Sequence, residues 1–224
     1  MENTQKINIK KKKAPKPKIT YQKLFWLFMV GSLLGVLMEG VFCIFVHGGW
    51  QTHVVSMWGP FCILYGIGAA GFYAGTVLLW NKNAAYRFVF FAVVADVVEL
   101  AAGLLLEFGL KMRAWNYSGQ FMNFRGHISL VMTIAWGVLG TGFSYIVPLL
   151  EKVFARMHHI GWKISCIILT IFMAVNLLFT GVCIIRWKNR HFGKPPANAI
   201  ERIIDERYDD EFMQKRFCEW RFLS

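Results

Sequence analysis

Five apolar stretches, each long enough to cross a lipid bilayer as a helix, dominate this sequence of 224 residues. They lie at residues 24–46, 58–80, 87–109, 128–150 and 163–185. A hydrocarbon core of about 30 Å requires roughly 20 residues at a helical rise of about 1.5 Å each. Lipid offers no hydrogen bonds to a bare backbone, so such stretches form helices. The sequence therefore predicts an all-α, polytopic membrane helix bundle of about five transmembrane helices.

The remaining composition excludes several classes of function. The five cysteines are widely spaced and form no Cys-x-x-Cys pair, so neither a disulfide framework nor a zinc site is expected. The chain has no Gly-rich phosphate loop, serine-hydrolase motif or zinc-protease motif. We expect no cofactor, no metal and no assignable catalytic residue. Whether the chain is an enzyme of another kind stays open at this point.

Positive charge is concentrated in the N-terminal tail. Residues 1–23 hold eight lysines and one acid, and so carry +7 of the formal net charge of +12. Basic residues that flank a transmembrane helix favour the cytoplasmic side and its anionic lipids. We expect a basic cytoplasmic tail at 1–23 and a transmembrane bundle at 24–185, in a multi-pass protein of the plasma membrane. No nucleic-acid recognition module accompanies these charges, so the expected partner is the lipid bilayer and not nucleic acid.

The C-terminal end of the bundle conflicts with this topology. After five crossings the chain should lie outside the cell, yet four basic residues follow the last stretch: Arg186, Lys188, Arg190 and Lys194. Either the basic cluster is tolerated outside, or one apolar stretch is re-entrant and both termini are cytoplasmic. We favour five full spans.

The second stretch begins with residues that disturb a helix. Gly59, Pro60, Tyr65 and Gly66 form a packing motif there. Proline lacks a backbone donor and glycine is conformationally free, so the motif predicts either a kink or a short unwound segment whose backbone groups are satisfied by neighbouring helices.

Residues 186–224 form a C-terminal tail that restarts as an amphipathic helix after Pro195 and Pro196. Asn198 is placed as its N-cap and Glu201 stands at the capping-box position. The helix either lies on the membrane, packs on the bundle, or docks a partner protein.

Four carboxylates lie inside the apolar stretches: Glu39 in the first, and Asp96, Glu99 and Glu107 in the third. An ionised side chain at the centre of a bilayer costs roughly 2.5 to 3.5 kcal/mol, so such residues usually face a partner cation or a polar cavity. The three acids of the third stretch follow helical spacing and form one polar stripe together with Gly103. Candidate cations for this stripe come next in the sequence, at Lys111, Arg113 and Arg125.

The acid stripe is either a buried network that fixes helix register, a pathway for a cation, proton or polar substrate, or a catalytic acid and base. The candidate pathway residues are Glu39, Asp96, Glu99, Glu107, Arg113, Trp115, Asn116, Tyr117, Asn123, Arg125 and His127.

Several motifs, taken in order, resemble one family. They are the run GPFCILYGIG at 59–68, the pair Glu99 and Glu107, WNYS at 115–118, NFRGHI at 123–128 and WG at 136–137. Together they are similar to the CmpB-like family, described as putative ABC-transporter type IV or putative ABC transporter permease, over residues 22–150. The chain departs from the family pattern at Ile63, Asn116 and His127. The resemblance implies an integral membrane protein that serves as the permease part of a transporter.

We therefore expect a permease-like subunit of unknown substrate, whose acid stripe lines a polar interior. Transport would require a homodimer or a separate ATPase, because this chain has no nucleotide site. Two alternatives stay open: a membrane enzyme that acts on a lipid or lipid-linked substrate, and a membrane scaffold or regulatory protein.

Overall fold

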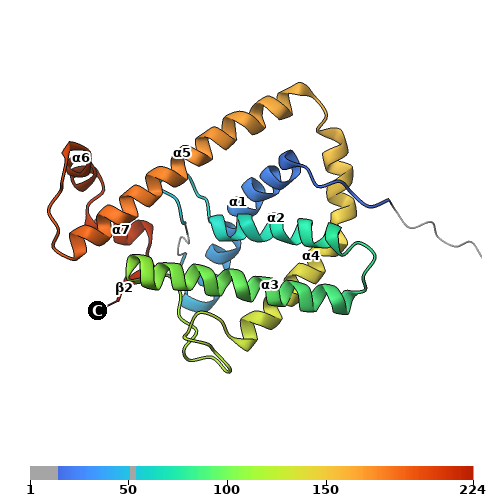
Figure 1. Cartoon of the computed structure of the whole chain (residues 1–224), viewed down its shortest axis with the longest axis horizontal. Coiled ribbons are helices and arrows are strands. Elements are labelled where there is room, and N and C mark those ends of the chain that lie inside the picture. Colours follow the sequence, from blue (N-terminus) through green and yellow to red (C-terminus); the bar gives the residue numbers. More distant parts are fainter. Residues whose placement is uncertain (1–14, 51–53, 224) are drawn as a thin grey trace, which may run out of the picture.

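The computed structural model describes residues 15–50 and 54–223, and its regular structure is almost entirely helical (Figure 1). Its five longest helices are α1 (Tyr21–His47), α2 (Ile63–Leu78), α3 (Ala84–Leu104), α4 (Leu130–Arg156) and α5 (Ile160–His191). A π-helical turn, η1 (Leu105–Leu110), extends α3. Two short helices, α6 (Ala199–Arg207) and α7 (Asp210–Arg216), and two antiparallel strands, β1 (Met112–Arg113) and β2 (Arg221–Phe222), complete the fold. The predicted all-α class is confirmed.

Within the described residues, four helical segments are long and apolar enough to cross a membrane: Tyr21–Phe45, Ala84–Leu110, Leu130–Arg156 and Ile160–His191. The second predicted span is shorter than expected, because α2 has 16 residues and is therefore about 24 Å long. Most of the predicted basic tail, residues 1–14, lies outside the described residues.

Local capping fixes where three of the long helices begin. The side chains of Thr20, Asn83 and Ser129 each accept a hydrogen bond from a backbone N–H in the first turn of α1, α3 and α4. These N–H groups have no partner within the helix, so a side-chain acceptor stabilises each start by about 1 kcal/mol.

The chain passes back and forth between two ends of the bundle. At one end Lys23, in the first turn of α1, contacts Glu151 near the end of α4 at 2.7 Å. At the other end Lys188 of α5 donates to the carbonyl of Gly109 at 2.8 Å. The start of α1 and the C-terminal tail thus lie at opposite ends, as Figure 1 shows, and five helices connect them.

α2 begins beside the middle of α1. The backbone N–H of Cys62 donates to the carbonyl of Ser32 at 3.0 Å, and Ser32 lies about 22 Å before the end of α1. Gly66 allows this approach, since a Cβ there would lie 2.1 Å from the Ser32 hydroxyl. Residues 54–62 therefore run back along α1 before α2 starts.

This returning segment, residues 54–62, is unwound, and side chains distant in sequence satisfy its backbone. Thr180 accepts from the N–H of Met57 at 2.8 Å, and Asn176 both accepts from and donates to the backbone of Trp58. Arg216 of α7 donates to the carbonyls of Ser56 and Gly59. Non-helical backbone at membrane depth persists only where the protein supplies such partners. Of the two predicted alternatives for the Gly59 and Pro60 motif, the structure contains the unwound segment.

The C-terminal tail packs on the bundle as two short helices instead of the single one expected. Asn198 caps α6 by accepting from the backbone N–H of Glu201 at 2.9 Å, as predicted. The Glu201 side chain accepts from the N–H of Ala197, one residue before the N–H of Asn198 that a capping box uses. Four buried tail side chains join a core cluster with residues of α5 and β1; they are Ile204, Met213, Phe217 and Trp220. This tail is an integral part of one end of the protein.

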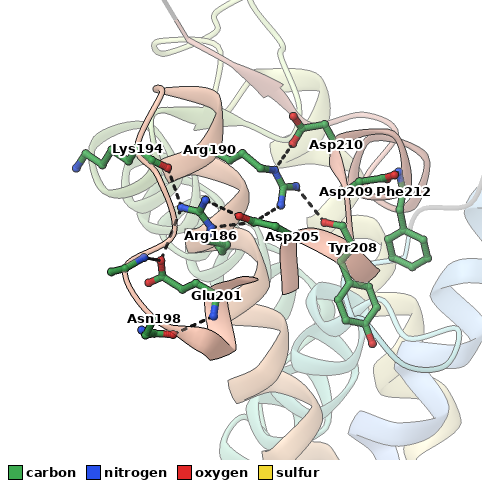
Figure 2. Close-up of polar contacts among 11 residues, drawn as sticks. Arg186, Arg190, Lys194, Asn198, Glu201, Asp205, Tyr208, Asp209, Asp210 and Phe212 are labelled. Carbon is green, nitrogen blue, oxygen red and sulfur yellow. Dashed lines mark hydrogen bonds and ion pairs between the residues drawn. The ribbon is translucent and has the colours of Figure 1, made fainter. Parts of the chain in front are cut away.

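Ion pairs fasten the tail to the end of α5 (Figure 2). Arg186 is only 2% exposed and donates two hydrogen bonds to Asp205, at 2.8 and 2.6 Å. Arg190 contacts Asp205 at 2.6 Å and Asp210 at 2.7 Å. The bonds from Arg186, and then those from Arg190, hold the pKa of the Asp205 carboxyl below its usual range. Two of the four basic residues that conflicted with the topology, Arg186 and Arg190, are thus paired with acids of the tail.

Candidate functional site

The four intramembrane acids have different surroundings. Glu39 accepts a hydrogen bond from the hydroxyl of Tyr65, and Asp96 accepts from the hydroxyl of Thr133 at 2.8 and 2.9 Å. Both pairs join neighbouring helices, α1 to α2 and α3 to α4. Each of these two acids has a neutral donor, which makes a helix-to-helix link inside an apolar bundle.

Glu107 is surrounded by basic groups. Its carboxylate oxygens contact Arg125 at 2.6 Å, His127 at 2.7 Å and Arg113 at 3.1 Å. His127 is almost fully buried, and its ring lies against Gly103, where a Cβ would come within 2.4 Å of Nδ1. With three basic side chains bound to it, this carboxylate is not available to a solute. We refer to Glu107, Arg113, Arg125 and His127 as the Glu107 cluster.

The loop at 111–129 holds the Glu107 cluster in place. Trp115 donates its indole N–H to the carbonyl of His127 at 2.9 Å. Asn116 accepts from Arg113 and from the N–H of Ser118. Asn123 donates to two loop carbonyls and accepts from Gly126. Three of the sequence-predicted site residues, Trp115, Asn116 and Asn123, therefore shape the loop.

Tyr117 connects the loop to Glu99. Its hydroxyl donates to Glu99 Oε1 at 3.3 Å. Burial, followed by the negative charge of Glu99, raises the pKa of the Tyr117 phenol above its usual range. The phenol therefore stays neutral at physiological pH and remains a hydrogen-bond donor.

Glu99 itself lacks a basic partner. It is 2% exposed, and its second oxygen, Oε2, has no hydrogen-bond partner among the described residues. The indole N–H of Trp136 interacts with this carboxylate without completing a well-formed hydrogen bond. A buried polar atom without a partner is costly, because it has lost water and gained nothing in return.

A pocket of about 90 Å³ adjoins Glu99 between α2, α3 and α4. Its walls are almost entirely apolar, and they comprise Leu64, Ile67, Gly68, Gly71, Phe72, Phe91, Val94, Ala95, Val98, Glu99 and Trp136. We refer to it as the Glu99 pocket. A volume of this size accommodates several water molecules or a small organic group.

The sequence alone does not predict this pocket. Trp136 belongs to the WG motif at 136–137 and Gly68 to the run at 59–68, and neither motif indicates a cavity. Gly68 and Gly71 leave one side of α2 open, but nothing in the local sequence shows that Glu99 of α3 lies beside it. The described residues contain no group of three metal-ligand side chains that could hold a metal ion.

Comparison with known proteins supports the family resemblance. Neither the curated proteins nor the solved structures yielded a match to this chain. The model of one family does match, over residues 26–181, which include α2, α3, α4 and the whole Glu99 pocket. The chain is therefore a multi-pass membrane protein that belongs to the family described as putative ABC-transporter type IV.

Proposed function

We propose that the protein is a permease-like subunit of a transporter in the plasma membrane, and that Glu99 contacts the transported solute. One observation carries the proposal: a carboxylate buried in a membrane-length helix holds an oxygen without a partner at the wall of an open pocket. Acids that serve packing alone are satisfied by the protein, whereas acids in transport pathways are available to a ligand.

The Glu107 cluster supports the choice of Glu99 as the solute-facing acid. Arg113 and Arg125 both contact Glu107, and so they are not free to hold a phosphate. This geometry argues against the alternative of a lipid enzyme that uses these two arginines. The scaffold alternative relied on a free tail helix, but the tail contributes Met213 and Phe217 to the protein's own core.

We infer that the N-terminal end of the bundle faces the cytoplasm, because the described basic residues near that end include Lys82, Arg87, Lys152 and Arg156. A separate ATPase would bind there and supply the energy that this chain cannot supply. A second copy of the chain would enlarge a translocation path that one copy can form only narrowly.

The experiment is purification of the full chain from its native membranes in mild detergent, followed by native mass spectrometry and an ATP hydrolysis assay. We expect a co-purifying ATPase subunit and hydrolysis of ATP by the complex. The Glu99→Gln variant should assemble the same complex and fail to transport. A complex without any ATPase that converts a lipid substrate would overturn the proposal in favour of the enzyme.

A further inference from the structure

We propose that the Glu99 pocket binds a hydrophobic organic cation, that is, an ammonium group carried on an apolar substituent. This inference rests on the proposed function, since it names the class of solute for the same site. It follows from the charge of the pocket, the chemistry of its walls and its position between helices.

The pocket holds a carboxyl group that no cation matches. None of its described lining residues is basic, and Glu99 Oε2 completes no hydrogen bond among the described residues, although the neutral indole of Trp136 lies beside it. Asp96 lies one helical turn before Glu99 and adds a second carboxylate whose hydrogen bond comes from the neutral hydroxyl of Thr133. A cationic ligand that donates a charge-assisted hydrogen bond to Oε2 would satisfy the buried atom and form an ion pair with the carboxylate.

Aromatic rings form the walls around the carboxylate. Phe72, Phe91 and Trp136 line the pocket, and the rings of Phe72 and Trp136 lie 6.2 Å apart, centre to centre. The negative face of an aromatic ring attracts a cation, and this attraction strengthens where water is excluded. A carboxylate with aromatic neighbours selects an organic ammonium over a hydrated metal ion, which would need several oxygen ligands.

The apolar part of the ligand has a place as well. Gly68 and Gly71 leave the α2 wall open, because a Cβ at either position would meet nothing within 4 Å. Ile67 of α2 is 50% exposed and Val94 of α3 is 41% exposed, so the pocket opens through a surface that lipid chains would cover. A hydrophobic substituent would leave the pocket between α2 and α3, toward the bilayer.

The test is equilibrium dialysis of radiolabelled phenethylammonium against the purified full chain in nanodiscs of phosphatidylcholine, a lipid without net charge. We expect saturable binding, and no competition from propylbenzene, the neutral molecule of the same shape. The Glu99→Gln variant should bind at least about tenfold more weakly, as loss of a charge-assisted hydrogen bond predicts.

Two glycine variants keep the test decisive if Glu99→Gln fails to fold. Gly71→Leu fills the Glu99 pocket without a steric clash at Cβ and leaves the acid intact; it should abolish binding. Gly142→Leu is the matched control, since it adds the same side chain to an equally open position of α4 outside the pocket. It should bind as the unaltered chain does.

The possible failures are distinguishable. If Glu99→Gln and Gly71→Leu both bound phenethylammonium as tightly as the unaltered chain does, the organic-cation inference would be overturned. Full competition by propylbenzene would overturn it as well. An ATPase complex that fails to bind phenethylammonium would also overturn it, while the proposed transporter role would stand. Saturable, Glu99-dependent binding by a chain that assembles with no ATPase supports the ligand class and contradicts the transporter role instead.

Discussion

Glu99 and Glu107 stand two turns apart on one continuous helical segment, and their surroundings are opposite in kind. Glu107 contacts two arginines and a histidine, whereas Glu99 receives one hydrogen bond from a tyrosine and has an oxygen without a partner. The difference comes from the loop at 111–129, which folds its bases over the end of α3 and reaches Glu99 only through Tyr117. The side chains that surround each acid, and not its position along the helix, therefore decide whether it stabilises the fold or is available to a ligand.

Truncation after Lys194 should have the largest effect and should disrupt the Glu107 side of the comparison. It removes four buried apolar side chains of the tail, whose burial is worth roughly 6 to 12 kcal/mol in total, and it removes β2, the partner of the strand that holds Arg113. The melting temperature, followed by size-exclusion chromatography of heated samples, should fall sharply. Ile203→Ser, at an exposed tail position, should leave it unchanged. A truncated chain that melts like the full one would show that the tail is independent of the bundle.

Glu107→Gln should cause the second-largest loss of stability. The amide leaves Arg113 and Arg125 close together without the carboxylate that matches their charge, and the loop at 111–129 loses its central contact. We expect a clear fall in melting temperature in the same assay. The exposed acid Glu206 is the control, and Glu206→Gln should melt as the unaltered chain does. Equal melting of the two variants would mean that the cluster contributes nothing.

Glu99→Gln should change stability little and function greatly. A neutral amide is cheaper to bury than an unpaired carboxylate, so the melting temperature should stay within about 3 °C or rise, the change that about 1 kcal/mol produces in a chain of this size. Transport by the purified complex should be lost. If Glu99→Gln destabilised the protein as much as Glu107→Gln, both acids would be structural, and the proposed difference between them would be wrong.

Gly71→Ala should give the smallest effect, a stabilisation of about 0.5 to 1 kcal/mol. Glycine in a helix interior costs conformational entropy, and the added methyl meets nothing within 4 Å. Chemical denaturation of the purified protein would measure it. A loss of stability would show that the open face of α2 is already filled by a neighbouring element.

The helical class, the tail caps and the approximate positions of the long helices follow from hydropathy and local sequence signals. The late start of α2 follows only in part, because the Gly59 and Pro60 motif predicts either a kink or an unwound segment and does not decide between them. The unwound form is stabilised by Asn176 and Thr180, which accept hydrogen bonds from the backbone of Trp58 and Met57 and lie far along the chain.

The candidate site, too, can be predicted from the sequence only in part. Glu107 and Arg113 are close in sequence, so their contact could be expected from the order of charges. The pocket beside Glu99 could not, because it depends on how α2, α3 and Trp136 of α4 meet in space. Sequence spacing places all three acids of the third apolar stretch on one face, but only tertiary packing decides which of them keeps a free oxygen.

The unwound segment at 54–62 also constrains the order in which the chain can mature during synthesis. Trp58 precedes its partner Asn176 by 118 residues, and Ser56 precedes its partner Arg216 by 160. At a translation rate of roughly 5 to 20 residues per second, these backbone groups wait for about six to thirty seconds until their partners have been synthesised. Until then they must be hydrated or held by the insertion machinery. Entry of residues 54–62 to their final depth is therefore a late step, completed only when the last helix and the tail have emerged.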